Sequence, residues 1–185
     1  MRMSIIHVSL ALLFVLPVMA AAAAEKPAPP TAAEVAKAKQ TGKYTVTVVT
    51  TKGTVTLQLD GKAAPRHVAN MVKLTQRGFY NGIKFHRVVP GFVAQAGDPL
   101  GTGAGGPGYT IKDEASSLKH AKGALGMAKT SMPDSAGSQW YICLEPLPKL
   151  DGRYTVFGKV TQGMAVVEKI AQGDKITKMT VKPTL

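Results

Sequence analysis

One stretch of the sequence, residues 85–98 (FHRVVPGFVAQAGD), places a permanent charge and an amide beside an apolar run. The charge belongs to Arg87 and the amide to Gln95, and the apolar run between them includes Phe92 and Val93. An arginine at the edge of a strand can simply bury its aliphatic stem and keep its charged head in water. Alternatively, its guanidinium lies over an apolar groove and donates hydrogen bonds to a carbonyl group. The stretch by itself favours the first interpretation, and the rest of the chain favours the second.

Other catalytic chemistries have less support in the sequence. The histidines, at positions 7, 67, 86 and 120, form no His-x-x-x-His pair and there is one cysteine, so we predict no metal site. Composition leaves a Ser-His-Asp triad open, but the Gly-x-Ser-x-Gly motif is absent and no paired carboxylates occur at helical spacing. The remaining groups are apolar and aromatic residues with one arginine and two glutamines. They suit the binding of an extended peptide better than proton transfer, and no cofactor is expected.

The glycine-rich segment Gly101–Gly108 matches the Gly-x-Gly-x-x-Gly dinucleotide fingerprint letter for letter. That fingerprint binds phosphate only between a strand and a helix, because the phosphate meets the helix N-terminus. Here Pro107 and a β-like segment, Tyr109–Ile111, follow instead. We therefore predict a surface loop and no nucleotide site. Asp98, just before this segment, and Asp151 are interpreted as turn formers.

The elements that must position these residues are mostly short strands. Alternating, β-branched segments at 44–50 and 54–59 flank a turn and predict a hairpin. Further strands are predicted at 138–144, 155–160 and 175–182, helices at 65–77 and 164–171, and a short exposed helix at 32–40. By the two-residue period of a strand, Gln139 and Tyr141 share one face, and Trp140 faces the core. Many short strands separated by turns favour a closed antiparallel barrel.

The N-terminal residues 1–24 predict a cleaved signal peptide. Arg2 supplies positive charge, an apolar run covers Ile5–Leu16, and small residues up to Ala24 offer cleavage sites. An uncleaved N-terminal anchor is the alternative, although the run is short for a bilayer. Residues 25–42, rich in Ala, Pro and Lys, predict a flexible leader without core contacts, and residues 43–185 form the single domain. We expect export to the periplasm, with full secretion as the alternative and no membrane anchor after cleavage.

The chain is strongly basic, with 23 Lys+Arg against 11 Asp+Glu and a formal net charge of +12. The lysines are scattered, without a basic run or interleaved aromatic residues. We therefore predict attraction to anionic surfaces but no specific nucleic-acid binding. Association with anionic envelope polymers is a further hypothesis. The lone Cys143 makes no internal disulfide, and its apolar setting predicts a buried, inert thiol.

Four separated segments together resemble a known family. They are FHRVVPGFVAQAGD (85–98), GALGMA (123–128), GSQWYIC (137–143) and LDGRYTVFGKV (150–160), in this order and at these separations. The chain from about Lys43 to Leu185 resembles a cyclophilin-type peptidyl-prolyl cis-trans isomerase, in a bacterial exported form. The resemblance implies a mainly β fold: an eight-stranded closed antiparallel barrel, capped by two α-helices, with the substrate groove on its outer face.

The resemblance also implies roles for individual residues. Arg87 matches the family's catalytic arginine, and Gln95 matches the glutamine beside it. The positions that match substrate-binding residues are Phe92, Val93, Ala128, Lys129, Gln139, Tyr141, Leu150 and Tyr154. Without the resemblance, Phe92 and Tyr141 would be interpreted as ordinary core.

The sequence departs from the family pattern at several positions. Val93 stands in for the more usual Met, Lys129 for a frequent Asn, and Tyr154 for a common His. Lys149 lies where many members carry Trp. Weak cyclosporin binding is therefore expected, whereas isomerase activity need not suffer.

Rotation about an Xaa-Pro bond requires no nucleophile and no metal. Amide resonance opposes the rotation with a barrier of about 18–20 kcal/mol. A donor aimed at the prolyl nitrogen stabilises the twisted amide, whose lone pair is free to accept, more than the planar one. Arg87 is the predicted donor and Gln95 the residue that fixes its reach.

The predicted function is thus isomerisation of Xaa-Pro bonds during the folding of exported proteins. The expected partners are proline-containing unfolded or extended polypeptides, and the expected oligomeric state is a monomer. The alternative is a peptide-holding chaperone or binding module with little catalysis. The presence of Arg87 with Phe92, Gln95 and Tyr141 favours the enzyme, because a pure binder has little need of the arginine.

Overall fold

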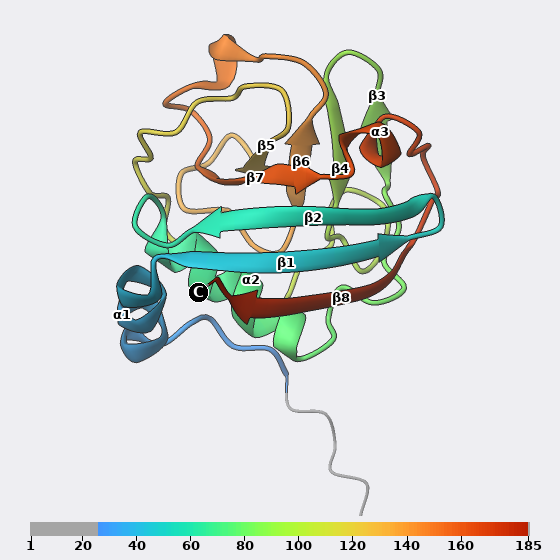
Figure 1. Ribbon diagram of the computed structural model, residues 1–185. Coiled ribbons are helices and arrows are strands. Elements are labelled where there is room, and N and C mark those ends of the chain that lie inside the picture. The colour runs from blue at the N-terminus through green and yellow to red at the C-terminus, as the bar shows by residue number, and fades with distance from the viewer. Residues whose placement is uncertain (1–25, 185) are drawn as a thin grey trace, which may run out of the picture.

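The structure, a computed structural model, describes residues 26–184 (Figure 1). The predicted signal peptide, residues 1–24, lies outside the described residues. Eight strands form one sheet in the order β3-β4-β6-β5-β7-β2-β1-β8, and every neighbouring pair is antiparallel. The strands are β1 (Lys43–Thr50), β2 (Gly53–Asp60), β3 (Arg87–Val89), β4 (Val93–Ala96), β5 (Ala124–Met127), β6 (Trp140–Cys143), β7 (Val156–Gln162) and β8 (Ile176–Pro183).

The sheet curves around the core but does not close (Figure 1). β3 and β8 stand at the two ends of the strand order and form no ladder with each other. Within residues 26–184, the segments before them meet at one isolated bridge, between Lys84 and Lys175. The closed barrel predicted from the sequence is therefore wrong, and the sheet is an open half-barrel. Backbone hydrogen bonds join the two edges before β3 begins, where the N–H groups of Gly82 and Phe85 donate to the carbonyls of Ile176 and Asp174, and β3 itself then runs on without pairing with β8.

The predicted hairpin and first main helix are confirmed. β1 and β2 pair without interruption, from Lys43 opposite Asp60 to Thr50 opposite Gly53. α2 (Pro65–Gln76) has its proline in the first turn, where a missing N–H costs nothing. The carboxylate of Glu114, from a distant loop, accepts the N–H groups of Arg66 and His67 at 2.9 Å each. This carboxylate caps the N-terminus of α2, because the residues next to the helix provide no side-chain cap.

The second main helix is shorter than the sequence indicated. α3 covers Met164–Val167, whereas the apolar spacing predicted a helix as far as Ala171. Beyond α3, the N–H groups of Lys169 and Ile170 donate to carbonyls three residues earlier, so the chain continues in tighter turns. These turns bury Ile170, and its packing determines the path of the chain more than helix propensity does.

Helix α1 (Ala32–Thr41) forms at nearly the residues that the sequence indicated and packs beside α2. The Nζ atom of Lys73 on α2 lies 3.0 Å from a carboxylate oxygen of Glu34 on α1. Ala38 is only 2% exposed and belongs to the main core. The prediction that residues 25–42 make no core contacts is therefore wrong at this helix.

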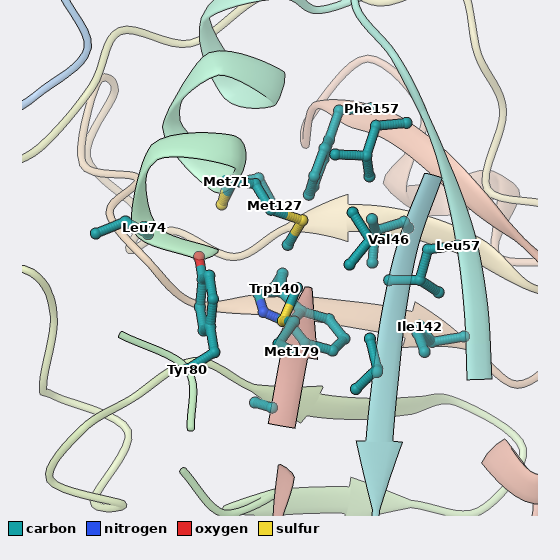
Figure 2. Packing of buried hydrophobic residues seen from close by; sticks show 14 of the residues in the cluster. Val46, Leu57, Met71, Leu74, Tyr80, Met127, Trp140, Ile142, Phe157 and Met179 are labelled. Carbon is teal, nitrogen blue, oxygen red and sulfur yellow. The ribbon is translucent and has the colours of Figure 1, made fainter. Parts of the chain in front are cut away.

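The inner face of the sheet and α2 enclose the main core (Figure 2). Trp140 on β6 is fully buried there, as predicted, and packs edge-on against Tyr80 and Phe85 with ring centroids 6.4 and 6.1 Å apart. Aromatic pairs in this geometry add to the stabilisation that burial provides. The core therefore holds β6 in a fixed position from one side.

A smaller apolar cluster, here called the outer cluster, lies on the other face of the sheet. Its buried members are Val93, Ala124, Tyr141, Cys143 and Val156, and partly buried residues around it include Phe92, Ala128, Leu150 and Tyr154. Along β6 the side chains alternate between the main core and this cluster, as the pleat of a strand requires. Burial raises the pKa of the Cys143 thiol to about 12, which supports the predicted inert thiol.

Candidate active site

Three adjacent strands bring the predicted catalytic pair and Tyr141 into one row. Arg87 on β3 is opposite Gln95 on β4, and Gln95 is opposite Tyr141 on β6. Side chains at directly opposed positions of antiparallel strands project from the same face of the sheet. The row therefore crosses the outer face, and Tyr141 within it is a buried member of the outer cluster.

A cavity of about 250 Å³, here called the outer cavity, opens at this row. Its lining consists of Arg87, Phe92, Val93, Gln95, Ala128, Lys129, Tyr141, Leu150 and Tyr154. These are all of the predicted site residues except Gln139. Segments that lie far apart in the sequence thus converge on one concave surface, in which the polar groups of Arg87, Gln95 and Lys129 stand beside apolar and aromatic side chains.

Gln139 lines a neighbouring cavity of about 480 Å³ instead. The two cavities share Gln95, Ala128 and Lys129 as common wall. Together they form a continuous depression longer than a single side chain, which suits an extended peptide.

A chain of hydrogen bonds fixes the amides of the site. Arg87 Nη1 donates to Gln95 Oε1 at 3.4 Å, and Gln95 Nε2 donates to Gln139 Oε1 at 2.9 Å. Gln139 Nε2 in turn donates to the carbonyl oxygens of Gly103 and Gly105, at 2.9 and 2.8 Å. Each amide therefore has a defined orientation, and the oxygen of Gln95 faces the guanidinium.

The guanidinium of Arg87 is held at the mouth of the outer cavity. Its Cζ lies 5.3 Å from the centroid of the Phe92 ring, within the range of a cation–π contact. The long bond to Gln95 uses one N–H of the five that an arginine carries. Arg87 is exposed, so its remaining donors are accessible to a bound ligand.

The glycine-rich loop borders the larger cavity and contains no helix, as predicted for a surface loop. Asp98 organises its start by accepting the N–H groups of Leu100, Thr102 and Gly103 at 2.7, 2.9 and 2.5 Å. Burial raises the pKa of Asp98, but these backbone donors, with Gly105, outweigh burial and hold the pKa below its usual value. The prediction that Asp98 forms a turn is confirmed.

The charge of Lys129 is paired within the wall of the site. Its Nζ lies 2.5 Å from an Asp113 oxygen. Burial raises the pKa of Asp113, but the bond from Lys129, the backbone N–H of Asp134 and the nearby positive charge together hold that pKa below its usual value. Lys129 therefore contributes its stem and backbone to the cavity and carries little unpaired charge.

Lys149 lies beside the site and outside its lining. It occupies the single 3₁₀ turn Pro148–Leu150, whose last residue faces the outer cavity. The expectation of weak cyclosporin binding, which depends on Lys149, stays a prediction.

The sequence did not predict three residues that contact Tyr141 or its partner as part of the site. His120 contacts the Tyr141 hydroxyl, Asp151 contacts His120, and Gly126 lies against the Tyr141 ring. Asp151 was interpreted only as a turn former. No sequence signal connects these positions, because their partners are 15 to 31 residues away along the chain.

Residues 26–184 contain neither a candidate metal cluster nor a helix that could span a membrane. No group of three or more His, Cys, Asp or Glu side chains is arranged to hold a metal ion. No helix in that part of the chain is both long and apolar enough to cross a membrane.

Comparison with known proteins identifies the family. The family described as cyclophilin type peptidyl-prolyl cis-trans isomerase/CLD matches residues 45–184. The peptidyl-prolyl cis-trans isomerase of Helicobacter pylori is 48% identical over 143 residues, which is 75% of this chain and 87% of that protein. Peptidyl-prolyl cis-trans isomerase B of Bacillus subtilis is 48% identical over 130 residues, 69% of this chain and 90% of that protein.

Solved structures agree with this result. A cyclophilin type peptidyl-prolyl cis-trans isomerase of Cryptosporidium parvum, determined in the presence of the dipeptide Ala-Pro, superposes with TM-score 0.70 and 30% identity. The alignment covers 76% of this chain and 99% of that one. The chain therefore belongs to the cyclophilin-type peptidyl-prolyl cis-trans isomerase family. The resemblance seen in the sequence is confirmed, and with it the assignment to this class of enzyme.

Proposed function

We propose that this isomerase binds the proline ring in the outer cavity and uses Arg87 to stabilise the twisted Xaa-Pro amide. The observation that carries the proposal is the row of Arg87, Gln95 and Tyr141 across three strands at a cavity whose wall includes apolar and aromatic side chains. The ring would pack against Phe92, Tyr141 and neighbouring apolar groups, and the guanidinium at the rim would face the prolyl nitrogen.

The chemistry follows from the amide itself. In the planar amide the nitrogen lone pair is delocalised, so it accepts a hydrogen bond poorly, whereas in the twisted amide it is localised. A donor fixed near the nitrogen thus binds the transition state more strongly than the ground state, which is the condition for catalysis. Arg87 is permanently charged, and its bond to Gln95 together with its position over Phe92 limits where it can point.

Arg87 would supply only part of the catalysis. An acceleration of about 10⁵-fold corresponds to roughly 7 kcal/mol, and one positioned donor in a site that excludes water supplies about 3–4 kcal/mol. The remainder is assigned to holding the ring while the preceding carbonyl rotates and to the exclusion of water from the apolar wall. Catalysis therefore depends on the wall of the cavity as well as on the donor.

The proposed substrates are proline-containing unfolded or extended segments of exported proteins, bound by a monomer. The depression formed by the two cavities supports an extended peptide, and the N-terminal sequence supports export. We propose the periplasm as the destination, with secretion as the alternative. A periplasmic protein would appear in the osmotic-shock fraction of its cells and would lack residues 1–24 by mass spectrometry.

The direct test is exchange NMR on a short Xaa-Pro-Phe peptide with the wild type and Arg87→Ala. We expect the variant to lose about 10²- to 10³-fold in isomerisation rate, the cost of removing one transition-state donor, while part of the peptide affinity survives. Lys178→Ala, which removes an exposed positive charge on β8, is the matched control and should keep full activity. Full activity in a folded Arg87→Ala variant would exclude the mechanism. Peptide binding by the wild type without faster exchange would indicate the peptide-holding module instead.

A further inference from the structure

A chain of three hydrogen-bonded side chains, Asp151, His120 and Tyr141, runs from a partly exposed carboxylate to the wall of the outer cavity. The Asp151 carboxylate oxygen Oδ1 accepts the backbone N–H of His120 at 2.9 Å and lies 2.8 Å from its ring nitrogen Nδ1. The other ring nitrogen, Nε2, lies 2.9 Å from the hydroxyl of Tyr141. The His120 side chain has no exposed surface, and Tyr141 is 5% exposed. Buried polar groups of this kind are retained only where they satisfy one another.

The donors and acceptors along the chain can be assigned. The backbone N–H and then the ring of His120 hold the pKa of Asp151 below its usual value, so the carboxylate is ionised and only accepts. Nδ1 of His120 therefore carries the proton that it donates to Asp151. A neutral imidazole protonated at Nδ1 has its lone pair at Nε2, so the Tyr141 hydroxyl donates to Nε2. Asp151 thus sets the tautomer of His120, and His120 sets the direction of the hydroxyl.

The Tyr141 ring is confined on its other sides as well. It stacks on the His120 ring with centroids 6.1 Å apart and an interplanar angle of 11°. It meets Tyr154 edge-on at 6.3 Å. A Cβ atom at Gly126 would overlap the Tyr141 ring, so the absence of a side chain there provides the space that the phenol occupies. The ring is therefore fixed at its hydroxyl, on its face and at its edge.

We propose that His120 and Asp151 are positioning residues for isomerisation, which hold the Tyr141 ring as a fixed wall of the proline cavity relative to Arg87. This inference rests on the proposed function. Tyr141 is opposite Gln95, and Gln95 bonds to Arg87, so a shift of the phenol changes the distance between the bound ring and the donor. Displacements of about 1 Å in such geometry cost on the order of 100-fold in rate. Neither His120 nor Asp151 lines the outer cavity, so both act through Tyr141.

The test separates positioning from stability by exchange NMR, which gives the affinity of the peptide and the rate of isomerisation in the bound state. We expect His120→Leu and Tyr141→Phe each to lower the bound rate by about 10- to 100-fold. Peptide affinity should stay within about threefold, because the apolar wall is still present. The double variant should be no slower than the slower single variant, since both changes break the same interaction. His120→Gln, whose amide oxygen can still accept the phenol hydrogen, should recover part of the rate.

The chain offers a matched control in a second histidine–carboxylate pair. His67 also has no exposed side-chain surface, and its Nδ1 lies 2.7 Å from Glu114, but it touches neither cavity. His67→Leu should lower the melting temperature and leave the bound rate unchanged. A destabilised His120→Leu or His120→Gln variant that isomerises at the wild-type rate would overturn the inference. In that case, an active wild type with an inactive Arg87→Ala variant would leave the proposed function intact. An inactive wild type would exclude both the proposed function and the role of His120 and Asp151.

Discussion

Strand β6 contributes to two apolar clusters that differ in how their side chains are held. On the inner face, Trp140 is surrounded by aromatic and aliphatic groups, and its indole N–H has no hydrogen-bond partner among the described residues. On the outer face, Tyr141 is nearly as buried, but hydrogen bonding through His120 to Asp151 fixes its hydroxyl. Close packing is sufficient for stability, because the side chains of a core can adjust their positions slightly and still exclude water. A surface that must meet a substrate at a defined distance from a donor needs directional contacts as well.

We expect the largest change in the free energy of unfolding when Trp140 is replaced. Trp140→Ala removes the central side chain of the main core, and we expect a loss of about 3–5 kcal/mol in the free energy of unfolding. Denaturant unfolding followed by circular dichroism measures it. Fluorescence is unsuitable, because the chain contains one tryptophan. A loss below about 1 kcal/mol would show that the inner face is not the main source of stability.

The sequence predicted the inner face better than the outer one for a physical reason. Alternation along β1 and β2 and helical spacing along α2 are local patterns, and they located the hairpin, the helix and Trp140 correctly. The open edge between β3 and β8 depends on how the curved sheet ends, which no local pattern records. Similarly, α3 stops early because the tertiary packing of Ile170 outweighs the helical spacing.

In the candidate site, too, some residues could be predicted from the sequence and others could not. The family motifs carry the residues that face the outer cavity, and the structure brings all but Gln139 of the predicted residues to its wall. The supporting contacts of His120 and Gly126 escaped prediction because each depends on a residue from another strand or loop. A histidine and a glycine have many structural uses, so their types alone gave no signal.

Gly126 allows the position of the Tyr141 ring to be changed without replacing any side chain that makes a hydrogen bond. Gly126→Ala would place a Cβ in the space of the Tyr141 ring, so the phenol must move. We expect a loss of about 10- to 100-fold in kcat/KM, the effect of a misplaced wall. Gly158→Ala on β7 is the control, because its Cβ would meet the β2 backbone and affect stability without a contact to the cavity. Wild-type activity in a folded Gly126→Ala variant would show that the position of Tyr141 does not limit the rate.

The smallest expected effect concerns acid, and it arises from the partly exposed carboxylate of Glu114, which pairs with the buried His67. Burial raises the pKa of Glu114, but bonds from the His67 ring and from the N–H groups of Arg66 and His67 lower it more, to below its usual 4.5. A carboxyl whose pKa is depressed by folding stabilises the protein above its unfolded pKa, and that contribution disappears as the pH falls through the folded value. Glu114 should therefore contribute fully at neutral pH and progressively less below about pH 4.5.

Glu114→Gln tests this directly. At pH 7 we expect it to lower the free energy of unfolding by about 0.5–2 kcal/mol, the cost of losing a helix cap. The variant and the wild type should converge as the pH falls through the depressed folded pKa of Glu114, because the wild-type carboxyl then becomes protonated. Urea unfolding at several pH values measures both, with kcat at pH 7 unchanged because Glu114 lies outside the outer cavity. A stability difference that is constant with pH would assign the effect of Glu114 to packing, and a fall in kcat would place the base of α2 in the catalytic site together with the outer face of β6.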